Sequence, residues 1–199
     1  MAKMKANRDR TNRTAVGEAP AADGFAASRQ SHFDDVMLSW RRERPNDDLT
    51  AMLLGICLTR IGRLLDADYD RLCKRNFDVS GAEMRLLLAL RRAGHPFARR
   101  PTDLFRSLLI TSGAITKQVD RLVSKELAAR EHDPLHAGGF LIRLTQKGVK
   151  LANSAVELMR DHSLLQEVLQ DMDPAVVKQG VAFNEALARE VERAFTRRD

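Results

Sequence analysis

Apolar residues recur at spacings of three and four along most of this chain, as on a helix that turns one face toward a core. Such runs predict helices at about residues 32–42, 49–75, 81–93, 101–108, 112–126, 146–170 and 174–196. Two short strands, Ala128–His132 and Phe140–Leu144, are expected around the loop sequence DPLHAGG. Between residues 101 and 145 the predicted order is helix, turn, helix, strand, strand, which is the order of a winged helix-turn-helix.

Helix-start signals support these boundaries. Ser80-Gly81-Ala82-Glu83 has the spacing of a capping box. Thr111 and Thr145 are placed to cap the helices that follow them, and Asp173-Pro174 joins a cap to a proline in the first turn. The expected fold class is therefore mostly α, with a small β-wing.

The domain organisation follows from the same pattern. Residues 1–30 are polar and basic and are expected to form a disordered arm, and residues 79–146 form the winged helix-turn-helix domain. The helices in 31–78 and 147–199 carry apolar faces that one small domain does not cover. A second copy of the chain would cover them, so we expect a two-fold homodimer, which suits a palindromic DNA operator.

Charge and composition narrow the function classes. The formal charge is +6, and residues 95–130 alone carry seven Lys/Arg against three Asp/Glu. This excess falls where phosphates would be neutralised, although a solvated surface can also show it. Aromatic residues make up 5%, too few for a platform that stacks single-stranded bases. Cys57 and Cys73 suit a reduced, cytoplasmic compartment, and the chain lacks the roughly 18 continuous apolar residues of a membrane span.

Enzyme chemistry is not indicated. The sequence has neither a phosphate-binding glycine loop nor an evident nucleophile with its base and orienting group. His132 and His136 are four residues apart but lie on the predicted wing, so no metal or other cofactor is expected.

The predicted recognition helix presents polar residues beside its apolar ones. Gln118 could pair with adenine, while Lys117 or Arg121 could donate to guanine or phosphate. Further candidate DNA contacts are Ser112, Thr116, Thr102, Arg99, Arg100, His136 and Arg143. The alternative is a polar face that meets only water.

Taken together, these segments resemble the MarR-type (multiple antibiotic resistance regulator) transcription factors. The resemblance rests on WRRERPNDDL at 40–49, SGAEMRLLLALRRAG at 80–94, PTDLFRSLLITSGAITKQVDRL at 101–122 and FLIRLTQKG at 140–148. The first and third of these are most similar to a subgroup with an extra N-terminal helix. The resemblance implies a homodimer that binds DNA through winged helices, commonly as a repressor, and that releases DNA when a small phenolic or other aromatic effector binds.

The wing departs from the family pattern. Where that pattern reads Asp-Pro-x-Asp-Arg-Arg, this chain has Asp133-Pro134-Leu135-His136-Ala137-Gly138, so Ala137 and Gly138 replace both arginines. We expect weaker wing contacts with DNA, with His136, Arg143 and the N-terminal arm compensating. An alternative function is a winged-helix dimerisation or regulatory module that no longer binds DNA tightly.

The effector site is predicted on the first and second helices, from Trp40, His32, Met37, Arg60 and Arg63. Simple packing of Trp40 is the alternative. Urate is not expected, because only the tryptophan of the urate-responsive subgroup is kept. Arg85 stands in place of its acidic residue, and Lys117 and Gln118 replace its Asn-Arg pair. The operator sequence, and whether the output is repression or activation, stay open.

Overall fold

The structure is a computed structural model that describes residues 32–136 and 138–197. It divides into two compact units, and the boundary between them falls after Gly55. The expected disordered arm, residues 1–30, lies outside the described residues. The first unit contains α1, His32–Glu43, and the beginning of α2, Thr50–Phe77. Asp48 lies just before α2, and its Oδ1 accepts a hydrogen bond from the Thr50 backbone N–H in the first turn at 2.9 Å.

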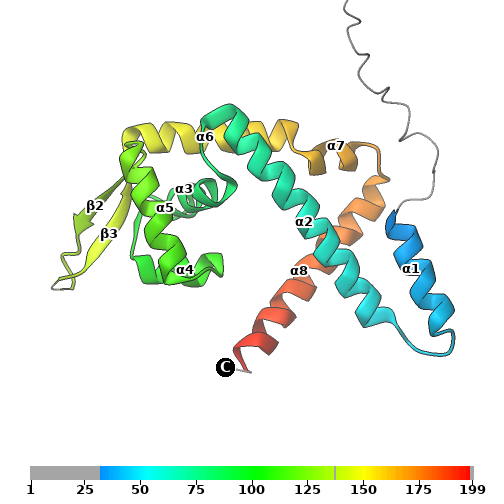
Figure 1. The fold of residues 1–199 in the computed structure, drawn as a ribbon. Coiled ribbons are helices and arrows are strands. Elements are labelled where there is room, and N and C mark those ends of the chain that lie inside the picture. Colours follow the sequence, from blue (N-terminus) through cyan, green and yellow to red (C-terminus); the bar gives the residue numbers. More distant parts are fainter. Residues whose placement is uncertain (1–31, 137, 198–199) are drawn as a thin grey trace, which may run out of the picture. The chain divides into compact units, whose positions relative to one another are not determined.

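The second unit contains the rest of α2 and all later elements (Figure 1). These are α3 (Gly81–Arg92), β1 (Ala98–Arg99), α4 (Pro101–Leu108), α5 (Ser112–Ser124), β2 (Ala128–His132), β3 (Phe140–Leu144), α6 (Gln146–His162), α7 (Leu164–Gln170) and α8 (Pro174–Thr196). The predicted fold class, mostly α with a small β-wing, is confirmed.

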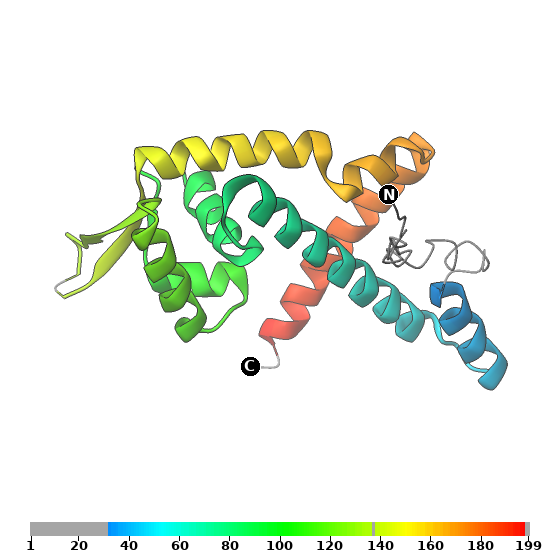
Figure 2. The same ribbon diagram turned by 45° about the horizontal axis from the view of Figure 1, so that its top comes forward.

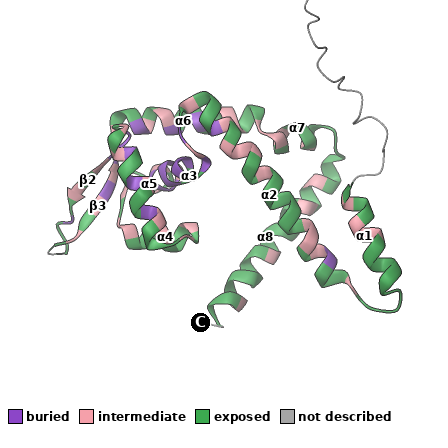
Figure 3. Cartoon of the chain, viewed as in Figure 1, coloured by how far each residue is buried: buried purple, intermediate pink, exposed green. Residues whose placement is uncertain are grey.

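The core of the second unit forms around α3, whose buried side chains pack against α4, α5, α6 and β3 (Figure 3). The largest of them are Met84, Leu86, Leu87 and Leu90, each 0% exposed. Fully burying one such side chain contributes about 1.5–3 kcal/mol. This helix therefore fixes the positions of the elements that carry the candidate site.

The start of α3 is fastened to α2. The capping box predicted for Ser80 and Glu83 is present, with both reciprocal hydrogen bonds formed. Asp70 on α2 accepts a further hydrogen bond from the Gly81 N–H at 2.9 Å. A Cβ at Gly81 would lie 2.9 Å from Cδ1 of Tyr69, so only glycine allows this approach.

The sheet has three antiparallel strands in the order β1-β3-β2. The bounds of β2 and β3 are those predicted, and Arg130 lies opposite Ile142. The two-residue strand β1 was not predicted. It pairs Ala98 with Arg143, which ties the segment before α4 to the wing.

A tight joint connects the C-terminal end of α5 to the N-terminus of α6. The predicted helix 112–126 ends at Ser124, and Glu126 takes a left-handed conformation with φ 60°. Thr145 caps α6 as predicted and also donates to the Glu126 carbonyl at 2.7 Å. A Cβ on Gly148 would lie 2.0 Å from the Leu127 carbonyl oxygen, so α6 packs directly on the backbone that follows α5.

The single long helix predicted for 146–170 is wrong, because the structure breaks it at Ser163. Ser163 has ψ 147° and caps α7 by accepting from the Gln166 N–H at 3.2 Å. The Leu164 N–H is satisfied by Asp68 Oδ2 of α2 at 3.3 Å. These two side chains replace the helical hydrogen bonds that a continuous helix would have made.

The last two helices are amphipathic, yet α7 and α8 contain no buried residue. Their apolar side chains stay about half exposed, among them Leu165, Val168, Val176, Val181, Phe183, Val191 and Phe195. In the part of the chain that the structure describes, no helix is long and apolar enough to cross a bilayer.

Candidate nucleic-acid interface

The helix-turn-helix consists of α4, a turn at Leu109 and α5 (Figures 1 and 2). Leu109 ends α4 in a left-handed conformation with φ 53°. Thr111 then caps α5, as predicted, by accepting from the Ala114 N–H at 3.3 Å. Ile115, Val119 and Leu122 bury one face of α5, which leaves the opposite face of the helix open to solvent.

Lys117 lies on this open face, where its side chain is exposed. The predicted contacts Ser112 and Thr116 are exposed as well, and the Thr116 hydroxyl donates to the Ser112 carbonyl at 3.1 Å. Thr102, in the first turn of α4, is also exposed. The structure thus groups Ser112, Thr116 and Lys117 on the N-terminal half of α5, where base contacts of a recognition helix concentrate.

Gln118 lies at the edge of the buried face. Its side-chain carbonyl oxygen is covered and has no hydrogen-bond partner among the described residues. A bidentate pair with adenine needs both ends of the amide in the groove. The Gln118 side chain must therefore turn outward before it can make the predicted contact.

Arg121 leans toward α3. Its Nη1 lies 3.8 Å from Oε1 of Glu83, whose side chain is only 4% exposed. The same Glu83 carboxylate closes the capping box of α3. This position gives Arg121 a role between the two helices that local sequence patterns did not indicate.

Ion pairs also engage the arginines of the wing. Arg143 Nε lies 2.7 Å from Glu131 Oε2 on the neighbouring strand, so the charge expected to compensate for the altered wing is already paired. Arg130 pairs with Asp120 of α5 and lies over the ring of Phe140, 5.8 Å from its centroid. Arg130 was not among the predicted site residues. Its place in a strand next to the recognition helix was the only signal in the sequence.

Arg100 and His136 meet at the base of the wing. Arg100 Nε donates to Asp133 Oδ2 at 2.7 Å, and Arg100 Nη2 lies 2.6 Å from His136 Nδ1. Asp133 is 2% exposed, and its Oδ1 accepts from the Leu135 N–H at 3.0 Å. This backbone hydrogen bond, together with the Arg100 guanidinium, lowers the pKa of the Asp133 carboxyl.

Fewer basic side chains are free to bind a phosphate than the total in the sequence suggests. Arg100, Arg121 and Arg143 each face a carboxylate. Within the described residues, Arg99 and Lys117 form no ion pair and are exposed. Both are therefore available for phosphate contacts.

The predicted effector residues lie on two helices. Trp40, His32 and Met37 are on α1, and Trp40 is 41% exposed. Arg60 and Arg63 are exposed residues of α2. A groove of about 440 Å³ lies elsewhere, between α2, α6 and α7. Its lining residues are Asp68, Leu72, Arg75, Asn76, Leu158, His162, Leu164 and Glu167.

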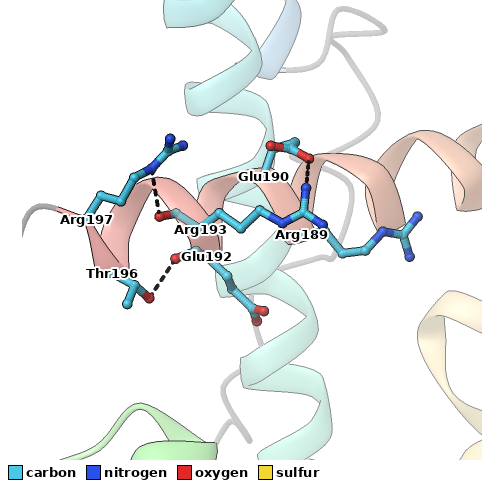
Figure 4. A pocket seen from close by; sticks show the side chains of 6 residues that line it. All are labelled: Arg189, Glu190, Glu192, Arg193, Thr196 and Arg197. Carbon is cyan, nitrogen blue, oxygen red and sulfur yellow. Dashed lines mark hydrogen bonds and ion pairs between the residues drawn. The ribbon is translucent and has the colours of Figure 1, made fainter.

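A larger hollow of about 680 Å³ follows the C-terminal half of α8 (Figure 4). Its lining residues are Arg189, Glu190, Glu192, Arg193 and Thr196 of that helix and Arg197, its C-cap. Arg193 Nη1 pairs with Glu190 Oε1 at 2.6 Å. Since the described chain supplies no second wall, this hollow is helix surface and offers no enclosed site for a small molecule.

Comparison with known proteins decides the family. A family model described as the MarR family matches residues 77–137. The HTH-type transcriptional regulator PecS of Dickeya dadantii (strain 3937) is 31% identical over 130 residues, which are 65% of this chain and 78% of PecS. The chain belongs to the MarR family. The resemblance to the MarR-type transcription factors is thereby confirmed, and the homologues MarR and PecS are transcriptional regulators, not enzymes. The subgroup with an extra N-terminal helix stays a prediction.

Solved MarR-family structures share the fold. The C80S mutant of MarR from E. coli, complexed with operator DNA, is 27% identical and has a TM-score of 0.54. That match covers 73% of this chain and 99% of the E. coli chain. Sco5413, a MarR family transcriptional regulator from Streptomyces coelicolor, is 20% identical with a TM-score of 0.61, over 73% of this chain and 98% of its own. This second likeness concerns the fold alone.

Proposed function

We propose that this MarR-family chain is a homodimeric, cytoplasmic regulator that binds a palindromic DNA operator through α5. The observation that carries the proposal is the open N-terminal half of α5, where Lys117 is exposed and unpaired among the described residues. A helix presented in this way, with a wing beside it, fits the major groove of duplex DNA. The E. coli MarR mutant complexed with operator DNA supports the same use of the fold.

The experiment that tests DNA binding is selection of bound duplexes from a random pool with the full chain. We expect a two-fold symmetric sequence whose half-sites lie about one helical turn apart. Recovery of unselected sequence, with affinity equal to that for random DNA, would contradict the proposal. It would favour the alternative function, a winged-helix dimerisation or regulatory module that no longer binds DNA tightly.

Apolar surface on the C-terminal helices supports the homodimer. The helix α8 spans 23 residues, and Val181, Phe183 and Phe195 on it are each more than half exposed. A helix gains most of its stability from packing its apolar face, so α8 needs a partner surface. A second copy provides one, and sedimentation equilibrium should give twice the chain mass of 22.4 kDa. A monomer at micromolar concentration would exclude this assembly.

The groove between α2, α6 and α7 supports regulation by a small aromatic acid. Leu72, Leu158 and Leu164 give it apolar walls, while Arg75 forms no ion pair within the described chain. The lining also holds the carboxylates of Asp68, which is paired with Arg71, and Glu167. An unpaired guanidinium beside an apolar wall suits a carboxylate on an aromatic ring. Release of DNA by such an effector, and hence repression relieved by it, is the regulatory behaviour that we propose.

The effector site is tested with benzoate and its uncharged analogue benzyl alcohol. We expect benzoate to raise the melting temperature and weaken operator binding, and benzyl alcohol to do neither. Arg75→Gln should abolish both effects, and Arg60→Gln should leave them intact. If instead Arg60→Gln abolishes both effects and Arg75→Gln leaves them intact, the effector binds at the residues predicted from the sequence. No response to any aromatic acid would remove the effector from the proposal while leaving DNA binding untouched.

A further inference from the structure

Arg100 stands at a helix position where short polar residues are preferred. It is the N-cap of α4, with φ −71° and ψ 148°, and its side chain makes no capping hydrogen bond. Ser, Thr, Asp and Asn are preferred at this position because their short side chains satisfy the free N–H groups of the first turn. The arginine is thus unhelpful to α4, which begins with Pro101.

The Arg100 side chain instead crosses to the loop of the wing. Its Nε donates to Asp133 Oδ2 at 2.7 Å, and its Nη2 lies 2.6 Å from His136 Nδ1. The Arg100 side chain is 34% exposed and the Asp133 side chain 3%. A charged hydrogen bond with one partner buried is stronger than a surface ion pair.

Asp133 in turn shapes the wing loop. Its Oδ1 accepts from the Leu135 N–H at 3.0 Å, and its own N–H donates to the Gly139 carbonyl at 3.0 Å. The Gly139 N–H donates to the His136 carbonyl at 3.0 Å. One guanidinium therefore reaches both the residue that organises the loop and the residue near its tip.

We propose that Arg100 is a positioning residue of the wing, which holds residues 133–136 of its loop against the start of α4, and that it does not contact DNA phosphate itself. This inference rests on the proposed DNA binding for its effect on affinity. Because Ala137 and Gly138 replace the arginines of the family wing, a fixed direction of the loop is what this wing contributes to DNA binding.

Arg99 provides a matched control. It is the neighbouring residue, carries the same charge, is exposed, and forms no ion pair within the described chain. If Arg99 binds a phosphate, its removal should lower the slope of log affinity against log salt by about 0.9 per protomer. Removal of a positioning side chain at Arg100 should weaken binding while the slope stays at the wild-type value.

The test compares Arg100→Gln, Arg100→Lys, Asp133→Asn and Arg99→Gln in the full chain. Hydrogen exchange is measured at the Leu135 and Gly139 amides, and operator binding is measured across a salt series. We expect Arg100→Gln to speed exchange at both amides about tenfold, as for loss of a hydrogen bond between charged groups, and Arg99→Gln to leave it unchanged. Arg100→Lys keeps the charge but not the two-pronged contact, so its exchange rates should lie between those of Arg100→Gln and Arg99→Gln.

The double variant Arg100→Gln with Asp133→Asn should bind DNA no more weakly than the weaker single variant. Additive losses, or a reduced salt slope for Arg100→Gln with unchanged loop exchange, would overturn the proposal and make Arg100 a phosphate contact. If the wild-type chain selects no DNA, the proposed function fails. The exchange experiment still decides whether Arg100 holds the loop.

Discussion

The guanidinium of Arg121 on α5 lies 3.8 Å from the buried carboxylate of Glu83 on α3. Glu83 also accepts the Ser80 N–H at 2.7 Å, so one side chain serves both the start of α3 and its contact with the recognition helix. Glu83→Ala should therefore lower the free energy of unfolding by about 1–2 kcal/mol, the cost of a lost cap with an unsatisfied N–H. Urea unfolding measures this loss.

Glu83→Gln is the control, since glutamine keeps the capping geometry and removes only the charge. Glu83→Gln should lower the free energy of unfolding by less than Glu83→Ala does. Equal losses for both variants would mean that the Arg121 ion pair, not the cap, is the larger contribution.

Lys117→Ala should weaken operator binding and reduce its salt dependence. Loss of one phosphate contact in each of two protomers lowers the slope of log affinity against log salt by about 1.8. Lys150, an exposed residue on α6, supplies the comparison, and Lys150→Ala should leave the slope unchanged. Fluorescence anisotropy over a salt series measures both, and an unaltered slope for Lys117→Ala would place that lysine outside the interface.

Gly113→Ala separates stability from DNA contact. A Cβ at Gly113 would meet nothing within 4 Å, and alanine favours a helix over glycine, so the variant should gain up to about 1 kcal/mol of stability. The same methyl group would stand between the N-terminus of α5 and DNA in the proposed complex. We expect a higher melting temperature together with weaker operator binding. Unchanged affinity would show that α5 enters the groove by another part of its surface.

Burial of Cys73 makes stability depend on alkaline pH. The thiol is 1% exposed, and burial raises its pKa to about 11. The thiol of the unfolded chain ionises near pH 8.5. The raised pKa therefore contributes stability that is complete below that pH and is lost as pH rises toward 11. Urea unfolding from pH 8 to 9.7 should show falling stability, with less decline in Cys73→Ala than in Cys57→Ala.

The upper limit of pH 9.7 matters because burial also raises the pKa of Tyr69. A free tyrosine has a pKa near 10 and is only about one-third ionised at pH 9.7, so its contribution within this window is small. An equal decline in both cysteine variants would assign the pH dependence to other groups.

Local patterns predicted the elements whose signals are local. Helix starts at Ser112, Gln146 and Pro174 follow from the caps before them, and β2 and β3 have the predicted bounds. The break at Ser163 was missed because its cause includes Asp68, which is 96 residues away from Leu164 in sequence. The strand β1 was missed because two residues form a strand only through their partner, β3.

The same limit applies to the candidate site. The sequence placed Lys117 on the recognition helix, and the structure leaves it open. The sequence could not show that Glu83 lies near Arg121, or that Asp133 pairs with Arg100, because each pair joins distant segments of the chain. Basic residues are easy to count in a sequence, but only the fold shows which of them still have charge available for a ligand.

The contact between Leu127 and Gly148 has a consequence for the operator. Because a methyl group on Gly148 would collide with the Leu127 carbonyl, we infer that this joint does not act as a hinge and that α5 and α6 keep a constant angle. In the proposed dimer, the separation of the two recognition helices is then determined by how α6, α7 and α8 pair with their copies. The C-terminal helices would then determine the spacing of the half-sites, and α5 would determine which bases are preferred. A chimaera of two regulators could therefore change one of these two properties without the other.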